Sequence, residues 1–283
     1  MHLPWQDANH KWSWLRAGAF ALMFMPALWV IYQYYDEQLG TVPLAGLTYW
    51  SGVWATSVLV LALGITPAVT ILRWKRLIDV RRMVGVAALF YTIGHIVIYF
   101  ALRRWNFSNI GVEMVTRPTL IVATLSTFGL VVLGATSFDA AVRSMGAKGW
   151  QQLHNAVYVA SGLAIVHYLL SPGIFPDQYL MSGMFFWLMV WRVLNRHGRG
   201  ANAGALAMLA VASCLFTALL EAGWIWVYHG YAPSGTLGNN FTLELGIPPA
   251  WQILALGLLI AVAAFLRHAP RVGAAGSGAC NAG

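Results

Sequence analysis

The stretch WQQLHNAVYVASGLAIVHYLLS, from Trp150 to Ser171, decides how the rest of the chain is read. It is apolar and reaches the length of about 20 residues that a helix needs to cross a bilayer. His154 stands near its start and His167 near its end, thirteen residues apart, which is a rise of roughly 20 Å along a helix. Histidines in an apolar span are costly unless something binds them, so both are candidates for a functional site. Ligands at two depths on one helix suit cofactors stacked across a membrane.

The composition excludes a soluble globular protein. Of 283 residues, 59% are hydrophobic and only 9% are charged, which indicates a polytopic membrane protein. The net charge of +8 comes from Lys and Arg in short loops between apolar runs, a pattern typical of cytoplasmic loops and not of nucleic-acid binding. The two cysteines support neither a disulfide framework nor a thiolate metal site.

Apolar runs predict eight spans, at about 14–34, 46–72, 83–102, 119–138, 150–171, 178–193, 203–227 and 250–266. Pro26 predicts a kink in the first span. Residues 106–116 and 139–149 are expected to be loops. The start of the chain shows no cleavable leader pattern, so the first span is expected to be retained. Basic flanks alternate between loops, which predicts that both termini are cytoplasmic.

A third histidine, His95, lies in the third predicted span. The third and fifth spans run in the same direction, and His95 follows Arg82 by thirteen residues, as His167 follows His154. His95 and His167 should therefore lie at similar depth, where two imidazoles could bind the iron of a b-type haem from opposite sides. By the same count, the residue of the third span at the depth of His154 is Arg81 or Arg82 and not a histidine. A second haem bound by His154, nearer the cytoplasmic side, would therefore have a weaker, absent or differently placed second ligand. On a straight helix His154 and His167 would point roughly 140° apart, unless a bulge or tilt corrects this.

Other interpretations stay open from the residues alone. A histidine in a span can simply form a hydrogen bond between helices, and a non-haem metal is an alternative to haem. Arg117 could pair with haem propionates or could be an ordinary interfacial arginine. Gln151 could orient His154 or bind a flavin or quinone, or could only cap a helix. Glu221 suggests a proton or quinone contact, with the alternative that it reaches out to water.

Several strings carry a family resemblance: LGITPA (63–68), RRMVGV (81–86), TIGHIVIY (92–99), TRP (116–118) and GWQQLHNAVYV with IVHYL (149–169). In these the chain resembles the ferric-reductase-like transmembrane superfamily and, within it, the MsrQ (YedZ) family of haem-binding membrane subunits. The resemblance covers about 14–196, six spans, and the last string is the most specific.

The resemblance implies that His95, His154 and His167 are haem-ligand positions for one or two haems b, and FMN is also associated with the family. Related NADPH oxidases have four such histidines, so the second haem site departs from that pattern. It further implies a bacterial inner-membrane subunit in the lipid bilayer. Its electrons would come from a cytoplasmic flavin reductase or a quinol, and would pass to a periplasmic molybdopterin methionine sulfoxide reductase that repairs oxidised envelope proteins.

The expected architecture is an all-α polytopic membrane protein, with a six-helix ferric-reductase-like bundle and two additional C-terminal transmembrane helices. The predicted divisions are a cytoplasmic segment (1–13), the haem-binding domain (14–197), the two additional spans (198–271) and a disordered tail (272–283). No glycine-rich nucleotide fingerprint occurs, so donor and acceptor should be separate proteins or molecules. The rival functions are a quinol-oxidising cytochrome b for another periplasmic oxidoreductase, and a transporter whose histidines relay protons.

Overall fold

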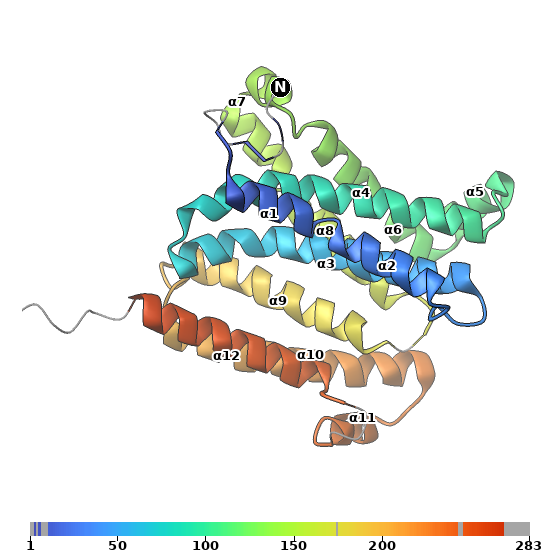
Figure 1. Ribbon diagram of the computed structural model, residues 1–283. Coiled ribbons are helices and arrows are strands. Elements are labelled where there is room, and N and C mark those ends of the chain that lie inside the picture. The colour runs from blue at the N-terminus through green and yellow to red at the C-terminus, as the bar shows by residue number, and fades with distance from the viewer. Residues whose placement is uncertain (1–2, 4, 7–10, 174, 243–245, 269–283) are drawn as a thin grey trace, which may run out of the picture.

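The computed structural model describes residues 3, 5–6, 11–173, 175–242 and 246–268, and within them the ordered elements are helices (Figure 1). The predicted tail at 272–283 lies outside the described residues, as does part of the segment 1–13. The helices are α1 (Trp14–Leu22), α2 (Met25–Tyr35), α3 (Pro43–Leu72), the short η1 (Lys75–Leu77), α4 (Ile78–Leu102), α5 (Phe107–Thr116), α6 (Pro118–Ala135), α7 (Asp139–His154), α8 (Val157–Leu169), α9 (Pro176–Arg196), α10 (Ala203–His229), α11 (Pro233–Asn239) and α12 (Pro249–His268).

Among the described residues, six segments are long and apolar enough to cross a membrane: Trp14–Tyr35, Pro43–Leu72, Lys75–Leu102, Pro118–Ala135, Ala203–His229 and Pro249–His268. The all-α, membrane-spanning fold is therefore confirmed. The expected spans at 150–171 and 178–193 do not meet the same test of length and composition. The helix expected at 150–171 is broken after His154, so that α8 has only 13 residues. Helix α9, in the region expected as the span 178–193, carries polar side chains along its 21 residues. Both still run alongside the long helices in Figure 1.

Two segments expected as loops are helical. Residues 107–116 form α5, and residues 139–154 form α7, which is kinked at Gly146 where φ is +70°. Helix α7 ends at His154, and the chain turns through Asn155 and Ala156 before α8 begins. His154 and His167 therefore lie on different helices, and the angle expected for a straight helix does not apply to them.

The first predicted span is interrupted between α1 and α2, where Pro26 stands in the first turn of α2, as expected from that proline. The side chain of Tyr91 on α4 occupies the gap. Its hydroxyl donates to the carbonyl of Met23 at 2.6 Å and accepts from the amide of Ala27 at 3.2 Å. A helix break exposes such backbone groups, and in lipid each must find a partner. Tyr91 thus supplies both partners and attaches the first span to α4.

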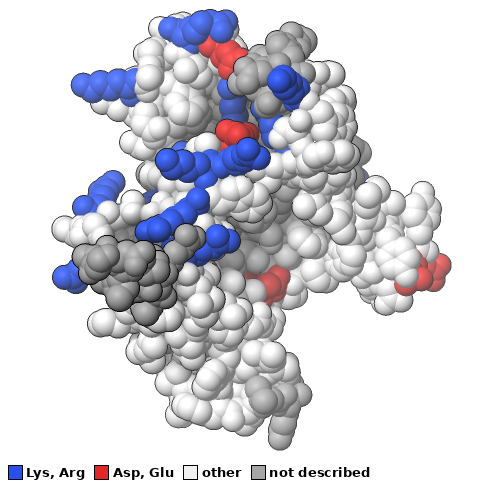
Figure 2. Space-filling model, turned by 60° about the vertical axis from the view of Figure 1, so that its left-hand side comes forward, with Lys and Arg blue, Asp and Glu red and all other residues white. Residues whose placement is uncertain are grey.

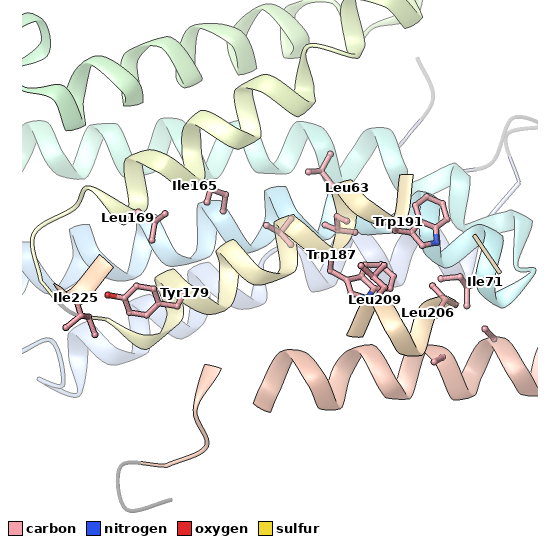
Figure 3. Close-up of a cluster of buried hydrophobic side chains, with 14 residues drawn as sticks. Leu63, Ile71, Ile165, Leu169, Tyr179, Trp187, Trp191, Leu206, Leu209 and Ile225 are labelled. Atoms are coloured by element: carbon pink, nitrogen blue, oxygen red, sulfur yellow. The ribbon is translucent and has the colours of Figure 1, made fainter. Parts of the chain in front are cut away.

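Helix α3 is the centre of the bundle. It is the most buried of the six spans, with 56% of its most apolar stretch inside the protein against at most 33% for any other. Two buried clusters share α3 and α8: one reaches α4 and α6, and the other reaches α9, α10 and α12. Figure 3 shows side chains of the second cluster converging from α3, α8, α9 and α10. The predicted boundary at residue 198 falls between α9 and α10, and this cluster extends across it.

Positive charge gathers at one end of the bundle. Lys and Arg dominate the end where α3, α9 and α12 finish and α4 begins, and Figure 2 looks toward it. Helices α5 and α11 lie at the other end (Figure 1). This asymmetry is the one that membrane proteins show between their cytoplasmic and external faces.

Candidate functional site

The structure brings two of the three candidate histidines together. The rings of His95 on α4 and His167 on α8 have centroids 6.5 Å apart and planes inclined at 64°. The two rings thus lie at similar depth between α4 and α8, with one turned edge-on toward the other. Both side chains are partly buried, in the half of the bundle away from the basic end.

Each ring is fixed through its Nδ1 atom. Nδ1 of His167 lies 3.0 Å from the carbonyl oxygen of Thr119, which can only accept, so this nitrogen carries the proton. Nδ1 of His95 lies 3.0 Å from Oγ of Ser51, whose hydroxyl donates to the carbonyl of Thr48 at 3.0 Å. The Ser51 oxygen therefore accepts from His95. In both rings Nε2 keeps its lone pair, which is the state of a metal-binding histidine whose other nitrogen donates to a neighbouring group.

The spacing fits one metal ion between the rings. Imidazole nitrogen binds a metal such as zinc at about 2 Å, and the ring centre lies about 1 Å further, so two rings on one ion have centroids about 6 Å apart. The 6.5 Å separation is close to this. Within the described residues no group of three or more His, Cys, Asp or Glu side chains converges. Haem iron needs only two protein ligands, since the porphyrin supplies the others, so this pair suits haem better than a bare metal ion.

Gly52 makes room for His95. A Cβ atom at this position would lie 3.1 Å from Cε1 of His95, closer than side chains normally pack. The Ser51–Gly52 pair on α3 therefore both binds one edge of the ring and leaves space for it.

His154 lies apart from this pair. Its ring stacks on Trp150, with centroids 3.8 Å apart, and its Nε2 lies 3.3 Å from Oγ of Ser137. Its Nδ1 is buried and has no hydrogen-bond partner among the described residues. Arg81 and Arg82 lie within electrostatic range, which agrees with the expected register, and among the described residues no histidine is recorded against this ring. Gln151 does not orient His154, because its amide donates to the Asn155 side chain at 3.1 Å.

Arg117 belongs to an ionic cluster at the end of the bundle near the histidine pair. The Glu113 carboxylate accepts from Tyr99 at 2.6 Å and pairs with Arg103 at 2.9 Å and Arg117 at 3.2 Å. The Tyr99 hydrogen bond, and then the two guanidinium groups, lower the pKa of Glu113 below its ordinary value. With two arginines and one carboxylate, the cluster has a net positive charge. Tyr99 follows His95 by one helical turn, so this charge lies close to the pair.

A large cavity opens beside His95. It has a volume of about 1530 Å³ and is lined by α1, α2, α3 and α4. His95 and Ser51 line it in one half of the bundle, and Arg16, Arg82 and Asp139 line it toward the basic end. Nε of Arg16 is buried without a hydrogen-bond partner among the described residues. The cavity is open along one side, since Phe24, Ile31 and Phe90 among its lining residues are themselves exposed.

Several residues at the site carry no sequence motif. Ser51 and Thr119 fix the two rings, but they are 44 and 48 residues from their partners. Next to His167, the hydroxyl of Tyr168 donates to Asp177, which also accepts from Tyr49 at 2.9 Å. This carboxylate joins α3, α8 and α9. Of these residues, only Thr119 could have been suspected from the sequence, because it directly follows the family string TRP at 116–118.

The chain is similar to known membrane proteins. The family model of the ferric reductase like transmembrane component matches residues 51–165. The protein-methionine-sulfoxide reductase heme-binding subunit MsrQ of Polaromonas naphthalenivorans is 32% identical over 199 residues, covering 68% of this chain and 90% of the relative. The MsrQ subunit of Azospira oryzae is 32% identical, with 69% and 84% covered, and that of Cronobacter sakazakii is 32% identical, with 64% and 91% covered. No solved structure matches the chain. The chain therefore belongs to the MsrQ family, within the ferric-reductase-like membrane proteins.

Proposed function

We propose that this protein is the haem-binding membrane subunit of a methionine sulfoxide reductase system, in which His95 and His167 would hold a b-type haem. The observation that carries the proposal is the pair of neighbouring rings of His95 and His167, with 6.5 Å between centroids, in which both Nδ1 atoms are engaged in hydrogen bonds. The relatives support it, since their names describe heme-binding subunits.

The protein's own residues have three tasks at such a site. Ser51 and Thr119 hold the imidazoles in the tautomer that presents Nε2, and the apolar helices around them exclude water. The positive cluster of Arg103 and Arg117 can pair with propionate groups, although Glu113 already occupies part of each guanidinium. When bound, haem supplies one-electron redox chemistry at its iron.

A second cofactor is part of the proposal. His154 has one buried nitrogen without a partner, and Arg16 presents a buried N–H group in the large cavity. The large cavity could hold a second cofactor, such as FMN, with Arg16 binding its acidic group, and His154, which does not line this cavity, would be a separate haem-ligand position. His154 would have to release Ser137 to present Nε2 to an iron.

The orientation and partners follow from charge and family. We place the basic end in the cytoplasm, with both termini there, in the bacterial inner membrane. The donor is a cytoplasmic flavin reductase or a quinol, and the acceptor is a periplasmic molybdopterin methionine sulfoxide reductase. A basic face favours encounter with an acidic reductase.

Reconstitution in liposomes tests the function. Reduced protein should be reoxidised when the periplasmic reductase and methionine sulfoxide are added, and His167→Ala should abolish this. To identify the electron donor, reduction of the protein is measured in two separate experiments, one with a flavin reductase and NADPH and one with a quinol. Reoxidation that is equally fast without the periplasmic reductase would contradict the proposal and favour a different acceptor.

A further inference from the structure

A narrow apolar groove runs between α3, α9 and α12, away from the histidine pair. Its volume is about 430 Å³, and its lining residues all belong to the described part of the chain. Two of them carry a side-chain nitrogen or oxygen. The hydroxyl of Ser57 donates to the Val53 carbonyl at 2.7 Å, and the indole N–H of Trp187 is buried beside Gly257. Water gains little from entering such a groove, and an empty groove leaves its walls without packing partners, so it suits an apolar occupant.

The groove is long and narrow. The three helices finish at the basic end, and on each of them the lining begins fifteen residues before the last residue, at Ser57, Met181 and Ile253. On α3 it continues to the last residue, Leu72, which gives a length of roughly 22 Å. Over this length the volume corresponds to a width of about 4–5 Å. One hydrocarbon chain fits this width, since carbon atoms pack about 4 Å apart, whereas a helix is about 10–12 Å wide.

The groove is open toward the surroundings of the bundle. Leu61 on α3 and Leu256 on α12 line it, and they are 52% and 41% exposed. Both helices are long and apolar enough to cross a membrane, so this opening faces the hydrocarbon of the bilayer. The hydrocarbon of one leaflet is about 15 Å thick, so a lipid chain from the leaflet at the basic end reaches most of the groove's length.

Two arginines stand at the basic end of the groove. Nε2 of His268 donates to the carbonyl of Ile71 at 3.1 Å, which joins the end of α12 to the end of α3. Arg267 directly precedes this histidine, and Arg73 follows Ile71 by two residues. Both arginines are exposed, and among the described residues neither forms an ion pair with a carboxylate. A phosphate group at the headgroup level of the bilayer is the partner that such guanidinium groups prefer.

We propose that the groove between α3, α9 and α12 is a binding site for one anionic phospholipid of the leaflet at the basic end. One acyl chain lies in the groove, and the phosphate lies at Arg73 and Arg267. The lipid fills the space between α3, most of which belongs to the family match at residues 51–165, and α12, which lies beyond it. The site contains none of the candidate histidines, so it stands whether or not the haem proposal does.

Native mass spectrometry of the purified full chain tests the groove. The detergent-solubilised protein is incubated with equal amounts of dioleoyl phosphatidylglycerol and dioleoyl phosphatidylcholine, and wild type should retain one phosphatidylglycerol per chain. Gly64→Leu should lose the bound lipid, because Gly64 lines the groove, no atom lies within 4 Å of a Cβ added there, and leucine favours helices. Gly85→Leu is the matched control, at an exposed glycine of α4 that lines neither cavity. Circular dichroism shows that each variant is folded.

A second pair of variants tests the charge. Arg73→Gln combined with Arg267→Gln should lower the preference for phosphatidylglycerol over phosphatidylcholine by roughly 30-fold, as expected for two basic groups near an anionic headgroup. Arg143→Gln combined with Lys148→Gln removes the same charge from α7, away from the groove, and should keep the preference. Equal retention of the two lipids by wild type, unchanged retention in Gly64→Leu, or an equal loss of preference in the two double variants would overturn the proposal.

Discussion

Oγ of Ser51 accepts a hydrogen bond from Nδ1 of His95 at 3.0 Å. The two residues are on neighbouring helices, α3 and α4, so the contact sets both the tautomer of the ring and its orientation toward His167. Because Ser51 in turn donates to the Thr48 carbonyl, its hydroxyl has a defined direction. The site is thus held by a short chain of hydrogen bonds that begins in the backbone of α3.

Replacing Ser51 by alanine should weaken cofactor binding without removing the ligand. Loss of such a supporting hydrogen bond typically costs about 10- to 100-fold in metal affinity. Haem retention and midpoint potential should therefore both change in Ser51→Ala. Ser57→Ala on the same helix is the control, since Ser57 bonds to the Val53 carbonyl and does not contact His95. Equal haem retention in the two variants would contradict this role of Ser51.

Gly52 should tolerate no side chain. A Cβ atom there would press on the His95 ring at 3.1 Å, so Gly52→Val should displace the ring and reduce the haem content of the purified protein. Gly64→Val is the matched control on α3, because no atom lies within 4 Å of a Cβ added there. Normal haem content in Gly52→Val would show that the ring does not sit as described.

Tyr91→Phe should loosen the first span. The variant leaves the Met23 carbonyl and the Ala27 amide without their partner, and each unsatisfied group costs about 1–3 kcal/mol. We expect a lower unfolding temperature in lipid and faster proteolysis between α1 and α2. Tyr32→Phe, on the exposed side of α2, should leave both unchanged.

The ionic cluster at Glu113 should make stability depend on pH. Its pKa is lowered in the folded protein by Tyr99 and the two arginines, so the ionised form stabilises the fold. This contribution is fully present above the unfolded pKa of about 4.3 and is lost as the pH falls through the lower, folded value. The unfolding temperatures of wild type and Glu113→Gln should therefore differ near neutral pH and converge in acid. A difference that grows on acidification would contradict the assignment.

The sequence predicted the fold class and the depth match of His95 and His167, because both depend on features local to one helix. Hydropathy marks a span, and counting from Arg82 or Lys148 gives depth at a fixed rise per residue. The break after His154 could not be foreseen, since the sequence from Trp150 to Ser171 contains no proline before Pro172 and no other strong helix breaker. Helices α5 and α7 were missed because they are too short or too polar to resemble spans.

The hydrogen bonds that orient the rings could not be predicted either. Ser51 and Thr119 are ordinary polar residues at the helix surface, and only the packing of α3 and α6 against α4 and α8 brings them to the histidines. Glu221 is partly buried and one of its carboxylate oxygens, Oε2, is buried, so the two alternatives for it, a proton or quinone contact and a contact with water, both stay predictions.

The most direct test of the central proposal is a reduced-minus-oxidised absorption spectrum with pyridine haemochrome quantitation on purified wild type, His167→Ala and His197→Ala. His197 follows α9 at the basic end and belongs to neither histidine site. A b-type spectrum in wild type and His197→Ala, with the haem content per chain reduced in His167→Ala, is the predicted result. A colourless wild-type protein from haem-replete cells, or undiminished haem in His167→Ala, would contradict bis-histidine binding by His95 and His167.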